Sequence, residues 1–196
     1  MINYEDKKMI SKFLHNAWPY LLIWGVMGLY LIVAPGVYNH FFVHEGKPVQ
    51  VNANLPAKVN ESQSFVDRLD VNNEEGGIYQ LFGWAFLTVD KKIPASAYQR
   101  QVVLLTEKGN SVFAAAAFRR TDVQIAYKNL GMDVNLSGIS ALINSNTLKP
   151  GIYRIGYIYK NIKSGNTYYI DTGRCLQRTA NKFSLEDFGS SICQLH

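Results

Sequence analysis

The segment from Asn16 to Asn39 constrains this chain most, because it contains no charged residue. Its central part, 17–38, reads AWPYLLIWGVMGLYLIVAPGVY, and about 20 predominantly apolar residues are enough for a helix to cross a bilayer. Trp18 and Tyr38 suit the two membrane–water interfaces, where aromatic rings are enriched. A buried core helix would show a polar face, which this segment lacks. The sequence therefore predicts a single transmembrane helix over 17–38.

A cleaved signal peptide is the alternative interpretation of this segment. Its apolar region is usually about 7–15 residues long, and here Pro35 follows Ala34 where cleavage would have to occur. We therefore favour an uncleaved anchor. Three lysines lie within residues 1–16, whereas Lys47 is the nearest cation beyond the helix, and this asymmetry predicts a cytoplasmic N-terminus, 1–16, and an extracytoplasmic remainder.

The two cysteines, Cys175 and Cys193, both fall on the predicted outer side. Because disulfides persist in oxidising compartments, a bridge that pins the C-terminal tail, 179–196, is one interpretation. Two unrelated free thiols are the other.

The rest of the sequence has the pattern of an all-β protein. Residues 39–63 contain Pro, Asn and Gly without a sustained period, which predicts a juxtamembrane stalk. Over 64–178, short apolar runs separated by turn residues predict a domain of about seven strands. The runs over 101–118 and over 151–173 each predict a hairpin with a Gly-containing loop. A single short helix is predicted over 121–129, capped by Thr121 or Asp122.

Two stretches specify the domain further. In YQLFGWAFLT, 79–88, both alternating faces are apolar, which predicts a central strand covered on both sides. LKPGIYRI, 148–155, looks like the tyrosine corner of immunoglobulin-like and fibronectin-like sandwiches, in which the hydroxyl of Tyr153 would bond back to the turn. The expected fold is an immunoglobulin-like β-sandwich, with a barrel as the alternative.

Three motifs in this order, FGWAF (82–86), RRTDVQIAY (119–127) and LKPGIYRI, resemble those of a known family. The family is a small extracytoplasmic β-sandwich domain of bacterial polytopic proteins of cell-surface polysaccharide synthesis, including glycosyltransferases and ligase-like enzymes. The resemblance covers about 64–172, and it departs from the usual pattern in Met132, where an aromatic residue is usual, and in the absence of an attached catalytic domain. The matching residues are Gly83, Trp84, Ala85, Arg120, Asp122, Val123, Leu148 and Gly151.

Residues for catalysis are scarce. A sortase-like cysteine enzyme needs a histidine partner for its thiolate, but no histidine occurs between His44 and His196. His40 and His44 have helical spacing for a zinc pair without a set of further ligands, so no metal or other cofactor is expected.

The acidic residues do not suggest catalysis either. The pairs Asp67 with Asp70 and Glu74 with Glu75 are interpreted as solvated carboxylates. Arg120 with Asp122 is interpreted as a helix cap and its counter-ion. We expect no catalytic activity, although a hydrolase or transferase with an unrecognised site is a third hypothesis.

Binding residues are the remaining candidates. Tyrosine offers a flat ring and a hydroxyl, which suit sugars and protein partners alike, although the same rings could form the core. On the predicted helix, Gly25 and Gly28 could allow close approach of a partner helix. The candidate ligand-binding residues are Tyr98, Tyr157, Tyr159, Tyr168 and Tyr169.

These features together predict a single-pass membrane protein that acts as a non-catalytic accessory subunit of envelope polysaccharide synthesis or export. The resemblance implies a polytopic membrane glycosyltransferase or polysaccharide exporter as its partner. The alternative is a membrane-tethered module that binds envelope glycan. The net charge of +5 is mild and the cations form no block in the sequence, which argues against nucleic acid as a partner.

Overall fold

The computed structural model describes residues 23–25, 27–28, 46–89, 91–180, 182–186 and 193. The chain divides into two compact units, 1–44 and 45–196. In the first unit, residues 23–25 and 27–28 are helical, and the rest of the predicted 17–38 helix lies outside the described residues. No helix within the described ranges is long and apolar enough to span a membrane.

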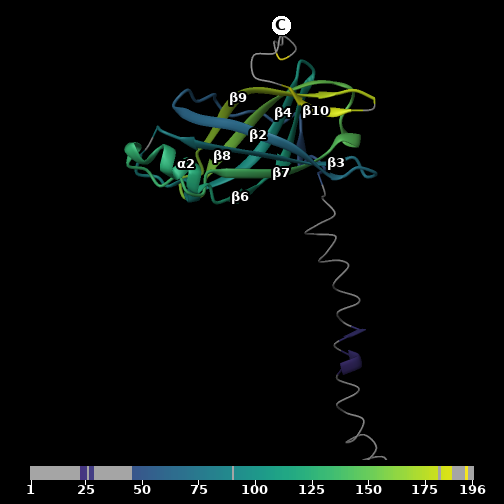
Figure 1. Cartoon of the computed structure of the whole chain (residues 1–196), viewed down its shortest axis with the longest axis horizontal. Coiled ribbons are helices and arrows are strands. Elements are labelled where there is room, and N and C mark those ends of the chain that lie inside the picture. Colours follow the sequence, from purple (N-terminus) through teal and green to yellow (C-terminus); the bar gives the residue numbers. More distant parts are fainter. Residues whose placement is uncertain are drawn as a thin grey trace, which may run out of the picture. The chain divides into compact units, whose positions relative to one another are not determined.

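The second unit is an all-β sandwich of two antiparallel sheets (Figure 1). One sheet has six strands in the order β1-β5-β4-β8-β9-β10, and the other has four in the order β2-β3-β7-β6. The strands of the described part are β1 (Gln50–Val51), β2 (Ser62–Asn73), β3 (Ile78–Leu87), β4 (Tyr98–Thr106), β5 (Gly109–Ala114), β6 (Ala116–Phe118), β7 (Gly138–Asn144), β8 (Gly151–Asn161), β9 (Thr167–Arg178) and β10 (Phe183–Glu186). Helix α2 (Thr121–Ala126) and the 3-10 turns η1 (Ala95–Ala97), η2 (Lys128–Leu130) and η3 (Ser145–Thr147) complete it.

The predicted strands and hairpins correspond to these elements. The hairpin over 101–118 is confirmed as β4 and β5, and the hairpin over 151–173 as β8 and β9. The run predicted as one strand after the first hairpin loop is divided at Ala115, because β5 belongs to the six-stranded sheet and β6 to the four-stranded one. Alternating hydrophobicity does not show that a strand changes sheets.

Strand β3 is the central strand that its sequence predicts. It lies between β2 and β7, and Leu81 and Ala85 on its inner face are 1% and 0% exposed. On its outer face, Phe86 and the partly buried Trp84 pack with Val123, which comes from α2. The apolar residues on both faces of β3 are thus covered, one set by the six-stranded sheet and the other by the segment that joins β6 to β7.

The tyrosine corner is present. Tyr153 lies near the start of β8, is 6% exposed, and its hydroxyl donates a hydrogen bond of 2.7 Å to the carbonyl oxygen of Lys149 in the preceding turn. The structural role expected of Tyr153 is confirmed.

The stalk predicted over 39–63 is shorter than expected, because its described part lies on the sandwich. Gln50 and Val51 pair with β5, and Lys58 bridges to Tyr169 in β9. The segment between them contributes Ala53 and Leu55 to a cluster of apolar side chains from the six-stranded sheet. These residues therefore cover an outer face whose apolar side chains would otherwise contact water.

The predicted C-terminal tail, 179–196, also carries part of the fold. Its strand β10 pairs with β9, and Cys193 forms a disulfide with Cys175 across a Cα–Cα distance of 5.6 Å. This distance lies in the usual range for disulfides, so the bridge is confirmed over the alternative of two free thiols.

Candidate functional site

The five candidate tyrosines are mostly core residues. Tyr157 and Tyr159 are 0% exposed, Tyr98 is 5% exposed and Tyr169 is 8% exposed. Only Tyr168 keeps a partly exposed side chain, and it too packs against the core. The prediction that Tyr157, Tyr159, Tyr98 and Tyr169 present rings to a ligand is therefore wrong, because the second sheet and the 53–58 segment cover them.

Two of the tyrosine hydroxyls connect the sheets. Tyr159 of β8 donates a hydrogen bond of 2.6 Å to the carbonyl of Ala85 in β3, and Tyr157 donates one of 3.3 Å to the carbonyl of Phe65 in β2. Burial raises the pKa of both hydroxyls, that of Tyr159 to about 12 although nearby Arg100 counteracts the rise. These groups stay protonated and bond the two layers together.

The sequence contained a signal that could have placed these rings. Side chains two residues apart share one face of a strand, so an inward Tyr153 also directs Tyr157 and Tyr159 inward. The position of Tyr157 and Tyr159 relative to the tyrosine corner is therefore a better guide to their burial than the general suitability of tyrosine for binding.

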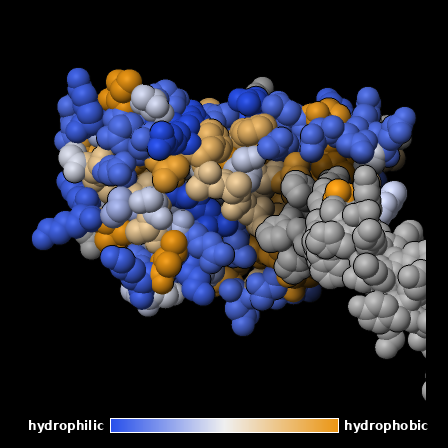
Figure 2. Space-filling view, turned by 90° about the horizontal axis from the view of Figure 1, so that it is seen from below, coloured by the Kyte–Doolittle hydropathy of each residue, from blue (hydrophilic) through white to orange (hydrophobic). Residues whose placement is uncertain are grey.

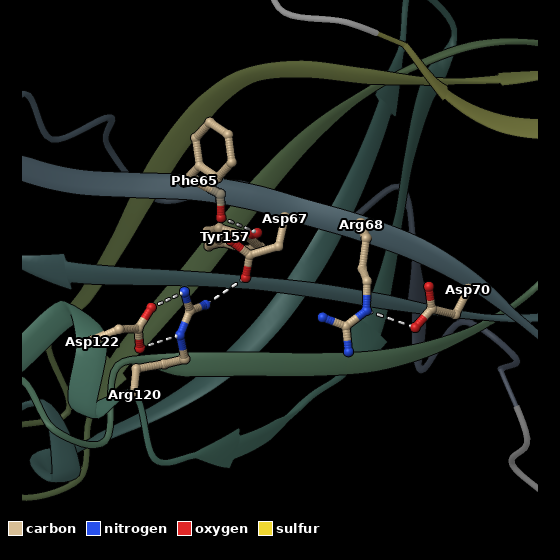
Figure 3. Close-up of polar contacts among 7 residues, drawn as sticks. All are labelled: Phe65, Asp67, Arg68, Asp70, Arg120, Asp122 and Tyr157. Atoms are coloured by element: carbon tan, nitrogen blue, oxygen red, sulfur yellow. Dashed lines mark hydrogen bonds and ion pairs between the residues drawn. The ribbon is translucent and has the colours of Figure 1, made fainter.

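Arg120 is the centre of a polar cluster in which its guanidinium contacts two carboxylates (Figure 3). Its Nε donates to Asp122 Oδ1 over 2.9 Å, its Nη2 to Asp122 Oδ2 over 2.6 Å, and its Nη1 to Asp67. Asp67 comes from β2 at a break in the pairing register between Val66 and Arg68. Such a bulge redirects a side chain, which explains how a strand residue reaches the start of α2.

The helix itself differs in part from the prediction. It begins after Arg120, which is the N-cap residue and makes no side-chain cap, so neither Thr121 nor Asp122 caps it. The predicted role of Asp122 as counter-ion is correct: the hydrogen bonds from Arg120 lower the pKa of Asp122 to about 2. An anion with so low a pKa is a weak base, so this cluster suits attachment of α2 to β2 better than proton transfer.

The predicted carboxylate pair of Asp67 and Asp70 is separated by the fold. Asp70 accepts a hydrogen bond of 2.7 Å from Arg68 and lies away from Asp67 and its partner Arg120 in Figure 3. The guanidinium of Arg68 also lies 4.3 Å from the ring centre of Phe82. Glu74 and Glu75 lie in the turn between β2 and β3, as expected.

Metal ligands are not gathered in the described part of the chain, where no group of three His, Cys, Asp or Glu side chains could hold an ion. The histidines considered for zinc, His40 and His44, lie outside the described residues.

A groove of about 530 Å³ lies at one end of the sandwich, between the β4–β5 and β7–β8 turns. Its lining includes the core residues Leu104 and Leu148. Its volume is in the range of small-molecule sites. Two of its polar side chains are already engaged, however: Asn110 exchanges hydrogen bonds with the backbone of Ala53, and Thr106 donates to the carbonyl of Gly109. These bonds stabilise the turns and weaken the case for a ligand.

The opposite end of the sandwich is built from three connections, which we call the three-loop end: 88–97 between β3 and β4, 119–137 between β6 and β7, and 162–166 between β8 and β9. Ala95 N–H donates to the Asp133 carbonyl and Ile162 N–H to the Ala97 carbonyl, both over 2.9 Å. Backbone hydrogen bonds therefore join all three loops into one surface.

A buried arginine supports this surface from beneath. Arg100 is 4% exposed, its Nη2 donates to the carbonyls of Ala95 and Leu136, and its Nε donates to the hydroxyl of Tyr159 over 3.1 Å. A buried cation is costly unless it is hydrogen-bonded, so the bonds from Arg100 hold the carbonyls of Ala95 and Leu136 in place. The sequence gives no sign of this role, since nothing in QRQVVLL distinguishes Arg100 from a surface cation.

The face seen in Figure 2 is mostly hydrophilic, with a pale-orange area in the middle over β6, the strand that lies lowest in Figure 1. In β6, Ala116 and Ala117 are exposed. Alanines offer little apolar area, so this face is a smooth strand edge and not a large hydrophobic patch.

The predicted helix–helix contact is compatible with the described part of the first unit. Among the described residues, a Cβ placed on Gly25 or Gly28 would meet no atom within 4 Å apart from the neighbouring residues and the backbone of its own helix. The helical residues Ile23, Trp24 and Met27 are 60%, 69% and 52% exposed.

Comparison of the chain with protein-family models, with curated proteins and with solved structures gives no match.

Proposed function

We propose that this chain is a membrane-anchored, non-catalytic accessory subunit of envelope polysaccharide synthesis or export. In this proposal the 17–38 segment spans the membrane, the N-terminus is cytoplasmic and the sandwich is extracytoplasmic. The partner is a polytopic glycosyltransferase or polysaccharide exporter. The observation that carries the proposal is the Cys175–Cys193 disulfide in a β-sandwich that follows an uncharged, membrane-length segment. Both features are typical of a domain held outside the cytoplasm.

The strand order supports an immunoglobulin-like arrangement of the sandwich. The order β2-β3-β7-β6 corresponds to strands A-B-E-D of that fold, and β5-β4-β8-β9 to C′-C-F-G. Tyr153 then lies at the start of strand F, after the E–F turn, where the tyrosine corner belongs. Many cell-surface domains share this sandwich architecture, which suits an extracytoplasmic subunit.

The polar clusters of the described residues favour a non-catalytic role. Perturbed pKa values are common in active sites, but those of Asp122, Tyr157 and Tyr159 have a packing explanation. Asp122 is held by Arg120, and Tyr157 and Tyr159 donate to backbone carbonyls across the core. Groups committed in this way are not available to a substrate.

A helix contact can be tested by co-purification of the full-length protein in mild detergent. Gly25→Leu with Gly28→Leu fills the open space beside the helix and should remove the polytopic partner from the complex. Ile23→Leu with Met27→Leu is the matched control, since these residues lie on the opposite side of a regular helix. Loss of the partner from both variants, or from neither, would contradict a glycine-mediated contact.

A tethered glycan-binding module is the second candidate function. It is favoured by the three-loop end, because two of its loops correspond to the B–C and F–G loops that form the binding end of immunoglobulin variable domains.

A further inference from the structure

The three-loop end concentrates positive charge that the sequence distributes along the chain. Each of its loops carries exposed lysines: Lys91 in the first, Lys128 in the second and Lys163 in the third. Among the described residues, no ion pair joins any of these three lysines to a carboxylate. Their charges are therefore open to an anion from outside the chain.

Aromatic rings lie beside one of these lysines. Tyr127 directly precedes Lys128, and its ring centre is 5.7 Å from that of Trp84. Both rings are partly exposed at the outer face of β3. A pair of partly exposed rings, one of them on the same loop as an exposed lysine, suits a ligand that combines a flat apolar face with an anion, since aromatic rings bind the former and lysine the latter.

The surface is also pre-formed and accessible. Arg100 fixes the carbonyls of Ala95 and Leu136 from below, so the loops need little ordering when they bind. The sandwich begins at the opposite end, where the carbonyl of Gly46 accepts a hydrogen bond of 2.7 Å from Asn144 N–H. In Figure 1, α2 marks the three-loop end and β10 the other.

We infer that the three-loop end binds a carboxylate-bearing polysaccharide, with Lys91, Lys128 and Lys163 contacting its carboxylates and Tyr127 with Trp84 stacking on a sugar ring. A sugar acid carries a ring and a carboxylate in one sugar unit, which suits a surface where Tyr127 and Lys128 lie on the same loop. This inference rests on the proposed function, because it names the ligand class that an accessory subunit of polysaccharide assembly would hold.

The test is binding of fluorescently end-labelled oligogalacturonate to the full-length protein in mild detergent, measured by fluorescence anisotropy. We expect saturable binding that weakens with added salt, because exposed charges are screened beyond about 8 Å at physiological ionic strength. Lys91→Glu, Lys128→Glu and Lys163→Glu together should weaken it at least about tenfold, since each lysine near an anionic surface contributes appreciably. A neutral maltooligosaccharide of equal length should not compete.

A matched control variant lies at the other end of the sandwich. Lys108→Glu, Lys149→Glu and Lys182→Glu change three exposed turn lysines by the same total charge and should leave binding nearly unchanged. Equal losses in the two variants would overturn the inference, because they would indicate non-specific attraction to net charge. Absence of oligogalacturonate binding at low salt would also overturn it.

Other classes of ligand are separated by competition. Equal competition by polyglutamate would overturn the inference in favour of an acidic protein, and equal competition by anionic phospholipid vesicles in favour of a lipid surface. The proposed function is judged separately by co-purification, which both lysine variants should retain. Retained co-purification without oligogalacturonate binding would reject the ligand class alone, and loss of the partner from unmodified protein would reject the accessory role.

Discussion

Gly83, in the middle of the FGWAF motif, is a position where a single added methyl group should destabilise the core strongly. A Cβ on Gly83 would lie 2.2 Å from the hydroxyl oxygen of Tyr157 and 2.5 Å from the carbonyl oxygen of Phe65. Both are far below van der Waals contact, and these two atoms are the donor and acceptor of one hydrogen bond across the core. Gly83→Ala must therefore separate the sheets locally or break that bond.

The expected cost follows from these two effects. Overpacking a well-packed core costs roughly 1–3 kcal/mol, and loss of a buried hydrogen bond adds about 1 kcal/mol. We expect Gly83→Ala to lower the free energy of unfolding by about 3 kcal/mol, equivalent to a fall in Tm of roughly 6–12 °C for a domain of this size. Thermal unfolding of the full-length protein in mild detergent, followed by near-UV circular dichroism, measures it.

A double-mutant cycle tests the cause. Tyr157→Phe alone should cost about 1 kcal/mol, but in the Gly83→Ala background it should cost less or stabilise, because it removes the atom closest to the new methyl group. Gly165→Ala is the control for introducing a methyl group into open space, where the only penalty is the left-handed backbone (φ 74°), about 1 kcal/mol. A neutral Gly83→Ala, or strictly additive effects in the cycle, would refute this reasoning.

Three further predictions concern other buried and bridging groups. Burial raises the pKa of the Tyr159 hydroxyl to about 12 from an ordinary 10.0. Its contribution to stability is therefore complete below pH 10 and falls by up to about 3 kcal/mol as the pH rises to 12. Urea midpoints should fall less steeply across this pH range in Tyr159→Phe than in the unmodified protein, and an equal slope in both would contradict the assignment. Arg120→Met should lower the free energy of unfolding by about 2 kcal/mol, because it leaves the carboxylates of Asp67 and Asp122 unpaired. Adding Asp67→Asn should restore part of this stability, and a further decrease in the double variant would argue against the pairing of Arg120 with Asp67. Replacing Cys175 and Cys193 by serine should lower the free energy of unfolding by about 2–4 kcal/mol. Reductant should lower the Tm of the unmodified protein but not that of the serine variant. An equal fall in both proteins would show that the disulfide is not the cause.

The sequence predicted the two-layer β architecture because its strongest signals are local. Apolar residues on both faces of YQLFGWAFLT require cover on both sides, and β3 has it. The Leu-x-Pro-Gly turn before Tyr153 fixes a specific hydrogen bond, and that bond is present. Turn residues between apolar runs located both hairpins.

The contacts that the sequence did not reveal depend on long-range topology. Gln50 and Val51 look like linker residues until β5 is present to pair with them. Asp67 reaches Arg120 only because a bulge changes the alternation of β2. In each case the partner lies far along the chain, so no local pattern marks the residue.

The candidate binding residues were also not located from the sequence: some were assigned to binding although they are buried, and others were not recognised. Tyr157 and Tyr159 were assigned to binding from their chemistry, although their position relative to Tyr153 already indicated burial. Lys91, Lys128 and Lys163 are dispersed in a sequence whose cations form no block, so no local pattern marks them. The fold places them on three loops that are hydrogen-bonded to one another, and only then do they form a candidate surface.

The accessory role is tested most directly by purifying the full-length protein from its native membrane in mild detergent and identifying stoichiometric partners by mass spectrometry. The account predicts a polytopic glycosyltransferase or polysaccharide exporter, retained through washing and lost from the Gly25→Leu, Gly28→Leu variant. Recovery of the protein alone, or with soluble partners only, would contradict it.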